Sequence, residues 1–144
     1  MIKLIELIDS IKDIRFVIQS YFKKKLKNND LGITVEMFEV LIVLSRRNSV
    51  NQQQIADTVR KNKANLTPII DKLSAKNLVL RQEDGSDRRN KLIILTEEGK
   101  KMCSVYNAMF EEFYVKFIQN IDLNNVDKTI AMLKNLGKQV SGSN

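Results

Sequence analysis

Apolar residues recur every three or four positions along most of this chain, which is the spacing of one face of an α-helix. The first such stretch covers residues 2–26, and its apolar stripe is broad for a helix that touches a single neighbour. A second follows Thr34, a suitable N-cap. Long periodic stretches also cover 97–120 and a segment that starts at Asp122 or Asn124. The pattern therefore predicts a mainly helical protein.

Two shorter apolar stretches lie in the middle of the chain. Asn51, with Gln54 three residues later, has the composition of a capping box, and it predicts a helix over about 52–60. The link 61–63 follows, where Asn62 is expected to adopt a left-handed conformation. A further helix is expected over about 64–76. Two short helices joined by a tight link form the helix-turn-helix pattern.

The pattern after Asn77, which is expected to end that helix, changes from helical to extended. Residues 78–82 and 91–95 are expected to form two strands, joined by the turn-rich segment 84–90. Thr96, followed by two glutamates, is suited to cap the next helix. A helix-turn-helix followed by a β-hairpin is a winged helix. The expected fold class is therefore α+β: mainly helical with a small hairpin wing and long flanking helices.

Charge narrows the choice of partner. The chain has 24 lysines and arginines against 17 aspartates and glutamates, a net charge of +7. Residues 60–91 contain nine cations and four acids, so this segment holds five of the seven surplus charges. Such a concentration suits a polyanionic partner such as nucleic acid, because cations neutralise phosphates. Solubility alone is the alternative explanation for a basic composition.

Missing residue types exclude several kinds of chemistry. The chain has no histidine and a single cysteine, Cys103, which excludes an intramolecular disulfide, a Cys/His zinc site and histidine acid–base catalysis. Because no glycine-rich phosphate loop or nucleophile–base pair is found, we expect no enzyme, cofactor or metal. Glu6 and Asp9 interrupt the first apolar run, and no run reaches the roughly 18 residues of a membrane span. We therefore expect a cytoplasmic protein without a membrane partner.

Three stretches resemble the MarR family of bacterial transcriptional regulators. NQQQIADTVRKNKANLTP (51–68) is similar to the family's helix and turn before the recognition helix. LTPIIDKLSAKNLVLR (66–81) is similar to the recognition helix and its exit into the wing. DGSDRRNKLIILTEEGKK (84–101) is similar to the wing, with its Asp-x-Arg and Leu-Thr-x-x-Gly pattern. The resemblance implies a sequence-specific regulator of transcription that binds double-stranded DNA, and in most cases a repressor.

The resemblance also implies an organisation for the whole chain. Residues 1–144 would form a single MarR-like domain, with a DNA-binding lobe at 33–96 and dimerisation helices at 2–27 and 97–140. The broad apolar stripes of those helices are compatible with a homodimer, whereas an intramolecular helical core is the alternative. A twofold dimer reads two half-sites about one helical turn apart, ~34 Å, which implies a pseudo-palindromic operator.

The wing contacts follow from the family pattern. Arg89, two places after Asp87, would enter the minor groove, where narrow A·T-rich segments have enhanced negative potential. Asp87 would hold Arg89 by a charge-assisted pair, and Arg88 would reach a phosphate. Lys91 completes the expected wing contacts. The alternative is a solvated surface turn with a local ion pair.

Outward positions of the recognition helix supply the other expected contacts. Asn pairs with an adenine edge, and Thr meets a base edge or a thymine methyl group. Lysines suit phosphates, which position the protein without specifying sequence. Pro68 departs from the family, where a basic residue is common, so the helix either begins late, with Pro68 in its first turn, or kinks. The expected contacts are Lys63, Ala64, Asn65, Thr67, Pro68 and Lys72 to the groove, with Gln53, Lys61 and Lys76 to the DNA backbone.

Regulation is implied only by the resemblance. Many family members release DNA when a small aromatic molecule binds near the junction of the dimerisation helices and the DNA-binding lobe, although the sequence assigns no effector-binding residue. Redox-sensing members carry a cysteine near the start of the first helix, whereas Cys103 is expected to be a small apolar filler. The alternative function is a winged-helix protein-interaction module that does not bind DNA and does not need Arg88 and Arg89.

Overall fold

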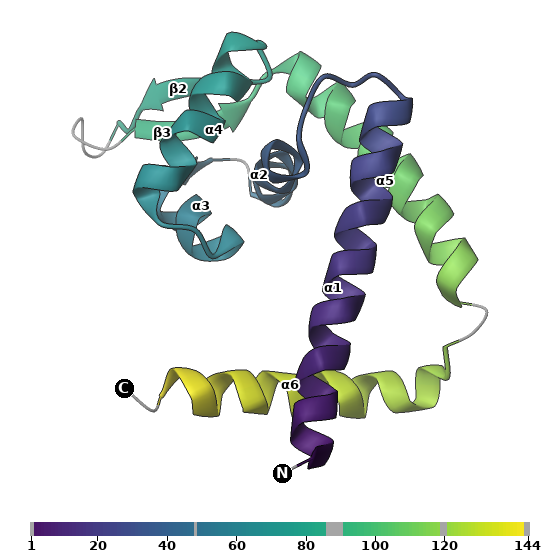
Figure 1. Cartoon of the computed structure of the whole chain (residues 1–144). Helices are drawn as coiled ribbons and strands as arrows, with labels where there is room; N and C mark the ends of the chain where they lie inside the picture. Colours follow the sequence, from purple (N-terminus) through teal and green to yellow (C-terminus); the bar gives the residue numbers. More distant parts are fainter. Residues whose placement is uncertain (1, 48, 86–90, 119–120, 143–144) are drawn as a thin grey trace. The chain divides into compact units, whose positions relative to one another are not determined.

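The computed structural model describes residues 2–47, 49–85, 91–118 and 121–142 (Figure 1). The chain divides into two compact units, Met1–Asn107 and Ala108–Asn144. The helices are α1 (Ile2–Asn28), α2 (Val35–Arg46), α3 (Gln52–Val59), α4 (Lys63–Ala75), α5 (Glu97–Ile118) and α6 (Leu123–Ser141). The strands are β1 (Val50–Asn51), β2 (Val79–Glu83) and β3 (Lys91–Leu95).

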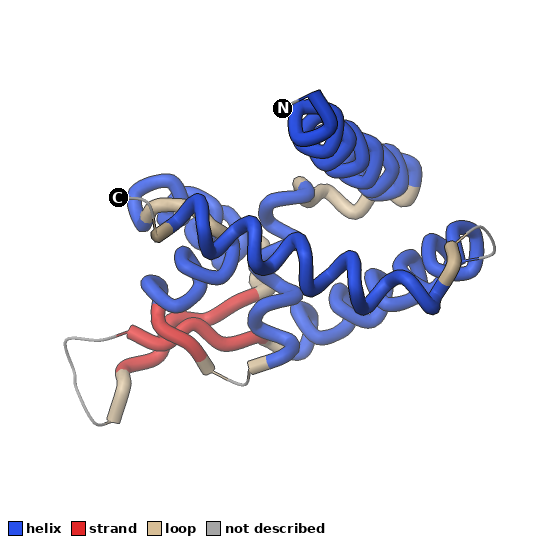
Figure 2. The backbone as a smooth tube through the Cα atoms, turned by 90° about the horizontal axis from the view of Figure 1, so that it is seen from below, coloured by secondary structure: helices blue, strands red, loops and turns tan. Residues whose placement is uncertain are grey.

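The strands form one antiparallel sheet in the order β1-β3-β2 (Figure 2). The predicted hairpin is confirmed, with Arg81 opposite Ile93 in its register. The sequence analysis missed β1, which pairs Val50 with the other side of Ile93. Two residues are too short to show an alternating pattern, so only the pairing with β3 reveals this strand. Ile93 in the central strand is buried on the helices and anchors the hairpin.

Most helix ends follow local side-chain chemistry. The Thr34 hydroxyl accepts a hydrogen bond from the backbone of Met37, and the predicted capping box of Asn51 and Gln54 is present. These caps satisfy backbone N–H groups that have no partner inside the helix. The predicted cap of α5 by Thr96 is also confirmed, as is the left-handed Asn77 after α4 (φ 55°).

One predicted turn conformation is wrong. The left-handed residue between α3 and α4 is Arg60 (φ 55°), which is the C-cap of α3. Asn62 has φ −76° and is the N-cap of α4, where its side chain accepts a hydrogen bond of 2.7 Å from the backbone of Asn65. The short amide side chain that tolerates a left-handed turn is also a good N-cap acceptor, and here the second property decides.

The first unit contains a continuous apolar core. It is built by α2, α3 and α4 together with β2 and β3, which pack against one another. This core fixes the position of the two short helices and of the hairpin. The side chains with essentially no exposure are Val40, Leu41, Ile55, Leu66, Ile70, Leu73, Val79 and Ile93.

The hairpin is joined to α5 by a tight junction at Thr96. The Thr96 hydroxyl donates to the carbonyl oxygen of Asn77 (2.7 Å) and accepts from the backbone of Gly99 (2.9 Å), while the Thr96 N–H donates to the carbonyl of Leu78 (3.1 Å). A β-carbon at Gly99 would lie 2.1 Å from that same carbonyl oxygen. In the Leu-Thr-x-x-Gly sequence, Thr96 therefore caps α5 and hydrogen-bonds to the end of α4, while Gly99 allows the backbone of α5 to approach Leu78 closely.

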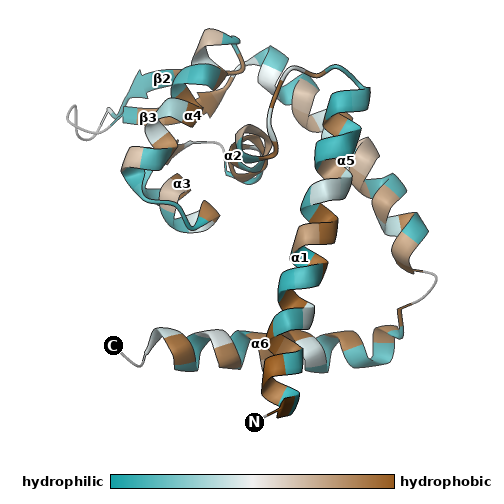
Figure 3. Cartoon of the chain, in the orientation of Figure 1, coloured by the Kyte–Doolittle hydropathy of each residue, from teal (hydrophilic) through white to brown (hydrophobic). Residues whose placement is uncertain are grey.

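Helices α1 and α6 each carry apolar side chains that the described residues leave exposed to solvent, and Figure 3 shows the hydropathy along each helix. In α1 the buried side chains are Phe22 and Leu26, near its C-terminal end. Within the second unit, α6 has no buried side chain. None of the helices in the described ranges has the length and apolarity to cross a lipid bilayer. The exposed apolar residues include Ile2, Leu4, Ile5, Ile8, Ile14, Phe16 and Val17 of α1, and Leu123, Ile130, Met132, Leu133 and Val140 of α6.

Substitution of Gly99 by alanine is expected to destabilise the protein by about 1–3 kcal/mol, because the new methyl group overlaps the Leu78 carbonyl and forces backbone movement. The measurement is urea unfolding at a fixed protomer concentration. Gly85→Ala is the matched control, since nothing lies within 4 Å of its β-carbon position. Equal unfolding midpoints for the two variants would contradict the close approach.

Candidate nucleic-acid interface

Helix α4 separates apolar and polar residues onto two faces. Leu66, Ile70 and Leu73 are buried, and the helix packs on α2, α3 and β2 through this face. The other face is open to solvent, as expected for a recognition helix. Of the positions predicted to point outward, the exposed ones are Lys63, Ala64, Asn65, Pro68, Lys72 and Lys76.

Thr67 differs from the other predicted contacts because it is half-buried between α4 and α3. Its hydroxyl donates to the carbonyl of Lys63 (3.0 Å) and accepts a hydrogen bond of 2.5 Å from the side-chain amide of Gln52. The structure thus uses the Thr67 hydroxyl to join the two helices. Gln52 was not identified from the sequence, because its partner is 15 residues away and no local pattern connects them.

Asn65 remains available for recognition. Its backbone N–H is bound by the Asn62 cap, but its exposed side-chain amide makes no hydrogen bond within the described part of the chain. The amide offers one acceptor and two donor hydrogens. This donor–acceptor pair matches the major-groove edge of adenine.

Pro68 lies inside α4, not at its start. The helix begins at Lys63 and continues to Ala75, so Pro68 occupies the second turn and the expectation of a late start is wrong. The physical reason is the Asn62 cap, which starts the helix at Lys63, five residues before Pro68. Because proline has no N–H, the helical hydrogen bond to the carbonyl of Ala64 is missing.

The predicted backbone contacts have different surroundings. Lys61 is half-buried and acts on two carboxylates of α2. A hydrogen bond from Thr34 is the main cause that lowers the pKa of Glu36, and Lys61 adds to it. Burial raises the pKa of Glu39, and the positive charge of Lys61 opposes that rise. Lys61 therefore lies at the junction of the turn with α2.

Lys76 and Gln53 also contact their own chain. The Lys76 ammonium lies 3.3 Å from the position that a β-carbon would take at Gly32, in the loop between α1 and α2. The Gln53 amide donates to Asp57 one helical turn away (2.8 Å). By contrast, Lys63 and Lys72 are exposed and have no ion pair among the described residues. The exposed face of α4 therefore has, near each end, a cation that forms no ion pair with the described part of the chain.

An ion pair links the wing to the recognition helix. The guanidinium of Arg81 on β2 binds the carboxylate of Asp71 on α4. The Arg81 side chain is 32% exposed and that of Asp71 56% exposed, so the pair is partly shielded from water. From the sequence, both residues contribute only to the charge balance of 60–91, because no local pattern pairs them. Their contact joins the first wing strand to α4 in addition to the packing of that strand on the helix.

The predicted tip of the wing lies outside the described residues. This applies to Asp87, Arg88 and Arg89, which fall in the segment 86–90. Lys91, the remaining predicted wing contact, is exposed at the start of β3 and lies opposite Glu83 in the hairpin.

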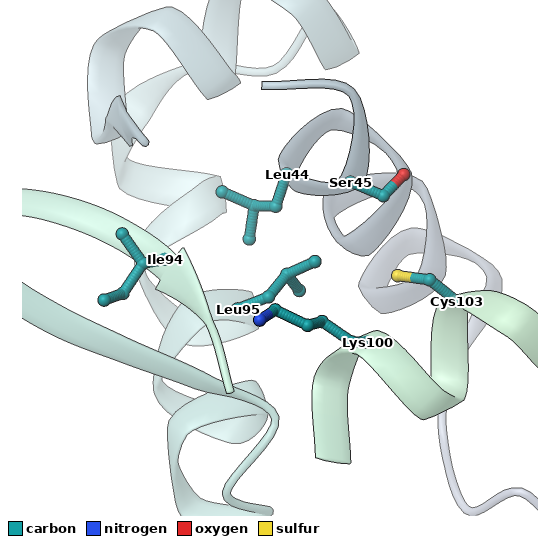
Figure 4. A pocket seen from close by; sticks show the side chains of 6 residues that line it. All are labelled: Leu44, Ser45, Ile94, Leu95, Lys100 and Cys103. Atoms are coloured by element: carbon teal, nitrogen blue, oxygen red, sulfur yellow. The ribbon is translucent and has the colours of Figure 1, made fainter. Parts of the chain in front are cut away.

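A cavity of about 430 Å³ lies in the first unit beside Cys103 (Figure 4). Its lining residues come from α2, β3 and the start of α5, and none of them is aromatic. The thiol is buried, and its sulfur lies 3.5 Å from the carbonyl oxygen of Leu41. Burial raises the pKa of Cys103, which agrees with its predicted role as an apolar filler. The lining consists of Leu44, Ser45, Ile94, Leu95, Lys100 and Cys103.

The ion pair of Asp71 and Arg81 is expected to contribute a coupling free energy of about 0.2–1 kcal/mol, the usual range for partly exposed pairs. A double-mutant cycle with Asp71→Asn and Arg81→Gln, read by urea unfolding, measures it. The coupling is expected to shrink in high salt because exposed charges are screened. The pair of Glu97 and Lys100 inside one helical turn is the control. Zero coupling at low salt would show that the contact does not hold the wing strand.

Cys103 is expected to react with iodoacetamide at least about tenfold more slowly in the folded protein than in urea at the same pH. Only the thiolate is reactive, and burial both raises the pKa of this thiol and blocks access. The reaction rate is measured by mass spectrometry. Equal rates in the two states would contradict a buried, protonated thiol.

Comparison with known proteins agrees with this geometry. The model of the MarR family matches residues 33–91. The regulator SarZ of Staphylococcus epidermidis, an HTH-type transcriptional regulator, is 31% identical over 114 residues, which cover 70% of this chain and 77% of SarZ. YfiV of Bacillus subtilis, described as an uncharacterized HTH-type transcriptional regulator, is 24% identical over 74% of this chain and 64% of its own.

Solved structures give the same fold. A MarR transcriptional regulator from Methanosarcina mazei has a TM-score of 0.80 and 25% identity, covering 93% of this chain and 97% of its own. The regulator SlyA has a TM-score of 0.83 at 20% identity, covering 94% of each chain. CouR of Rhodococcus jostii, solved with p-coumaroyl-CoA, has a TM-score of 0.74 at 24% identity, covering 93% and 90%. The chain thus belongs to the MarR family and is a winged-helix transcriptional regulator.

Proposed function

We propose that this regulator is a homodimeric repressor that binds a pseudo-palindromic DNA operator through α4 and the wing. The observation that carries the proposal is the exposed face of α4. It presents the amide of Asn65 between the cations Lys63 and Lys72, none of which has a side-chain partner among the described residues, while the opposite face is held in the core. An amide reads a base edge and cations neutralise phosphates, so this face supplies both kinds of contact.

The apolar faces of α1 and α6 support a second copy of the chain as the protein partner. In α1, Ile2 is 75% exposed and Phe16 70% exposed. Exposed apolar surface of this kind is costly in water and is removed when two copies bury it. A twofold dimer also places two copies of α4 on one face of the DNA, which a pseudo-palindrome requires.

The remaining site assignments follow the family pattern. Arg89 would insert into the minor groove with support from Asp87, while Arg88 and Lys91 would contact phosphates. Gln53, Lys61 and Lys76 are proposed as further contacts to the DNA backbone. Among these, Lys61 would have to serve both the DNA and the α2 carboxylates, whose pKa values respond to it. We rank Lys63 and Lys72 above it for this reason.

Regulation by a small aromatic effector is proposed by analogy with the family. CouR, which shares the fold, was solved with p-coumaroyl-CoA. No effector residue is assigned to this chain. We further infer that the protein has no catalytic activity, because the curated relatives named above are transcriptional regulators. Since its target would be chromosomal DNA, it would act in the cytoplasm.

Replacement of Arg89 by alanine is expected to weaken binding to specific DNA by ~1–3 kcal/mol, the usual size of one specific contact. Fluorescence anisotropy would compare the duplex upstream of the protein's own coding region with scrambled DNA over a salt series. The wild type should prefer the upstream duplex and weaken steeply with salt, because phosphate contacts release counterions. Arg47→Ala, an exposed arginine at the end of α2, is the matched control and should bind like the wild type.

Two results would contradict the proposal in different ways. Unchanged binding by Arg89→Ala would contradict the proposed DNA contact of Arg89, and α4 would then be the element that recognises the operator sequence. Absence of binding to either duplex at low salt would remove the DNA-binding proposal. The chain would then be a winged-helix module for protein interaction, the second candidate function.

A further inference from the structure

The exposed face of α4 has an unusual chemistry for a surface that meets DNA. Ala64, Pro68 and Lys72 follow one another at intervals of four residues, so they lie along one line on the helix. All three are exposed, and Asn65 is next to Ala64 on the same face. The middle of the face therefore consists of two small apolar side chains. The amide of Asn65 and the ion-paired carboxylate of Asp71, three residues after Pro68, lie beside them, and Lys63 and Lys72 lie toward the two ends of the helix.

Thr67 does not add a polar group to this patch. Its hydroxyl hydrogen is donated to the carbonyl of Lys63, and its oxygen accepts from Gln52. Thr67 acts here as a positioning residue. It directly precedes Pro68, and its two hydrogen bonds hold this part of α4 against α3. Asn62, which also has an amide, is occupied as the N-cap. Asn65 is thus the one amide near the patch without a hydrogen bond in the described ranges.

We propose that Ala64 and Pro68 form an apolar patch that reads the C5-methyl groups of thymine in the major groove. Together with Asn65, which suits adenine, the patch would select A·T pairs at the centre of each half-site. The proposal rests on the proposed DNA-binding function and names the sequence class that the same helix recognises.

The chemistry of the base edges favours this choice over G·C pairs. Thymine is the base whose major-groove edge carries a methyl group, and apolar side chains contact it favourably. Guanine presents two acceptors and cytosine an amino donor, and neither Ala64 nor Pro68 has a side-chain group that pairs with them. Docking the patch on a G·C pair would leave these polar groups without water or partner, which is unfavourable.

The proline is suited to this task by its rigidity. Its ring fixes the backbone angle φ, and its side chain has no extended rotamers to order on binding. Its place in the second turn puts it between the cations Lys63 and Lys72, one on each side along the helix. The phosphate contacts of those lysines would press the ring against the groove floor.

The test uses duplexes selected by the wild-type protein from a randomised pool at fixed salt. Each selected duplex is made again with deoxyuridine in place of thymidine. This change removes the C5-methyl groups and keeps every base-pairing hydrogen bond. Wild-type affinity is expected to fall by about fourfold per contacted methyl group, the effect of one buried methylene-sized group. Unselected duplexes with the same substitution give the background.

Variants assign the effect to α4. Pro68→Ser is expected to lower the ratio of thymine to uracil affinity to the part that Ala64 contributes, whereas Pro68→Ala, which keeps an apolar side chain and regains a backbone N–H, should retain more of the ratio. Arg89→Ala is expected to bind more weakly and to keep the full ratio, because its proposed contact is in the minor groove. Circular dichroism melting of each variant separates a reading defect from a folding defect.

The outcomes distinguish the inference from the proposed function. Equal wild-type affinity for the thymine and uracil forms, or selected half-sites centred on G·C pairs, would overturn the thymine inference while DNA binding stands. A thymine preference that survives in Pro68→Ser and disappears in Arg89→Ala would also overturn it, since the wing would then read the difference. Failure to select any duplex from the pool would overturn both.

Discussion

The carbonyl oxygen of Leu78 is the point on which the arrangement of this molecule depends. It lies just before β2, accepts the N–H of Thr96, and has Gly99 of α5 against it without room for a β-carbon. The Thr96 hydroxyl adds a bond to Asn77 and caps α5 at the same time. The end of the recognition helix, the ends of both wing strands and the start of α5 are therefore joined by contacts at one point.

The polar residues of α4 divide into two groups with different tasks. Asn62, Thr67 and Asp71 make hydrogen bonds or ion pairs inside the protein, to the helix start, to Gln52 and to Arg81. These contacts hold the helix in a fixed orientation. Asn65 and the lysines of the helix are left for a partner. A recognition helix needs both groups, because a base contact is specific only if the side chain that makes it is held in place.

Helices α1 and α6 differ from the DNA-binding lobe in how far their apolar side chains are buried. The lobe buries most of its apolar residues within one chain, whereas α6 has no buried side chain and the buried ones of α1 are Phe22 and Leu26. Stability of the isolated chain does not explain such faces, since each exposed apolar side chain loses the free energy of burial. The proposed homodimer would explain them, because the same faces would then form an interface that sets two recognition helices at a defined spacing.

Local sequence determined much of this protein: the helical periodicity, the caps at Thr34 and Asn51, the hairpin, and the outward residues of α4. These features depend on residues within one or two turns of each other, so the local sequence pattern is enough to predict them. The tertiary structure alone decided which polar residues are paired with distant parts of the chain. Thr67 meets Gln52 across 15 positions, Thr96 meets Asn77 across 19, and β1 exists only because β3 lies beside it. Asn62 is the N-cap of α4, and the left-handed residue of the turn is Arg60, the C-cap of α3. Distant pairings of this kind arise from packing of the core, which no local pattern specifies.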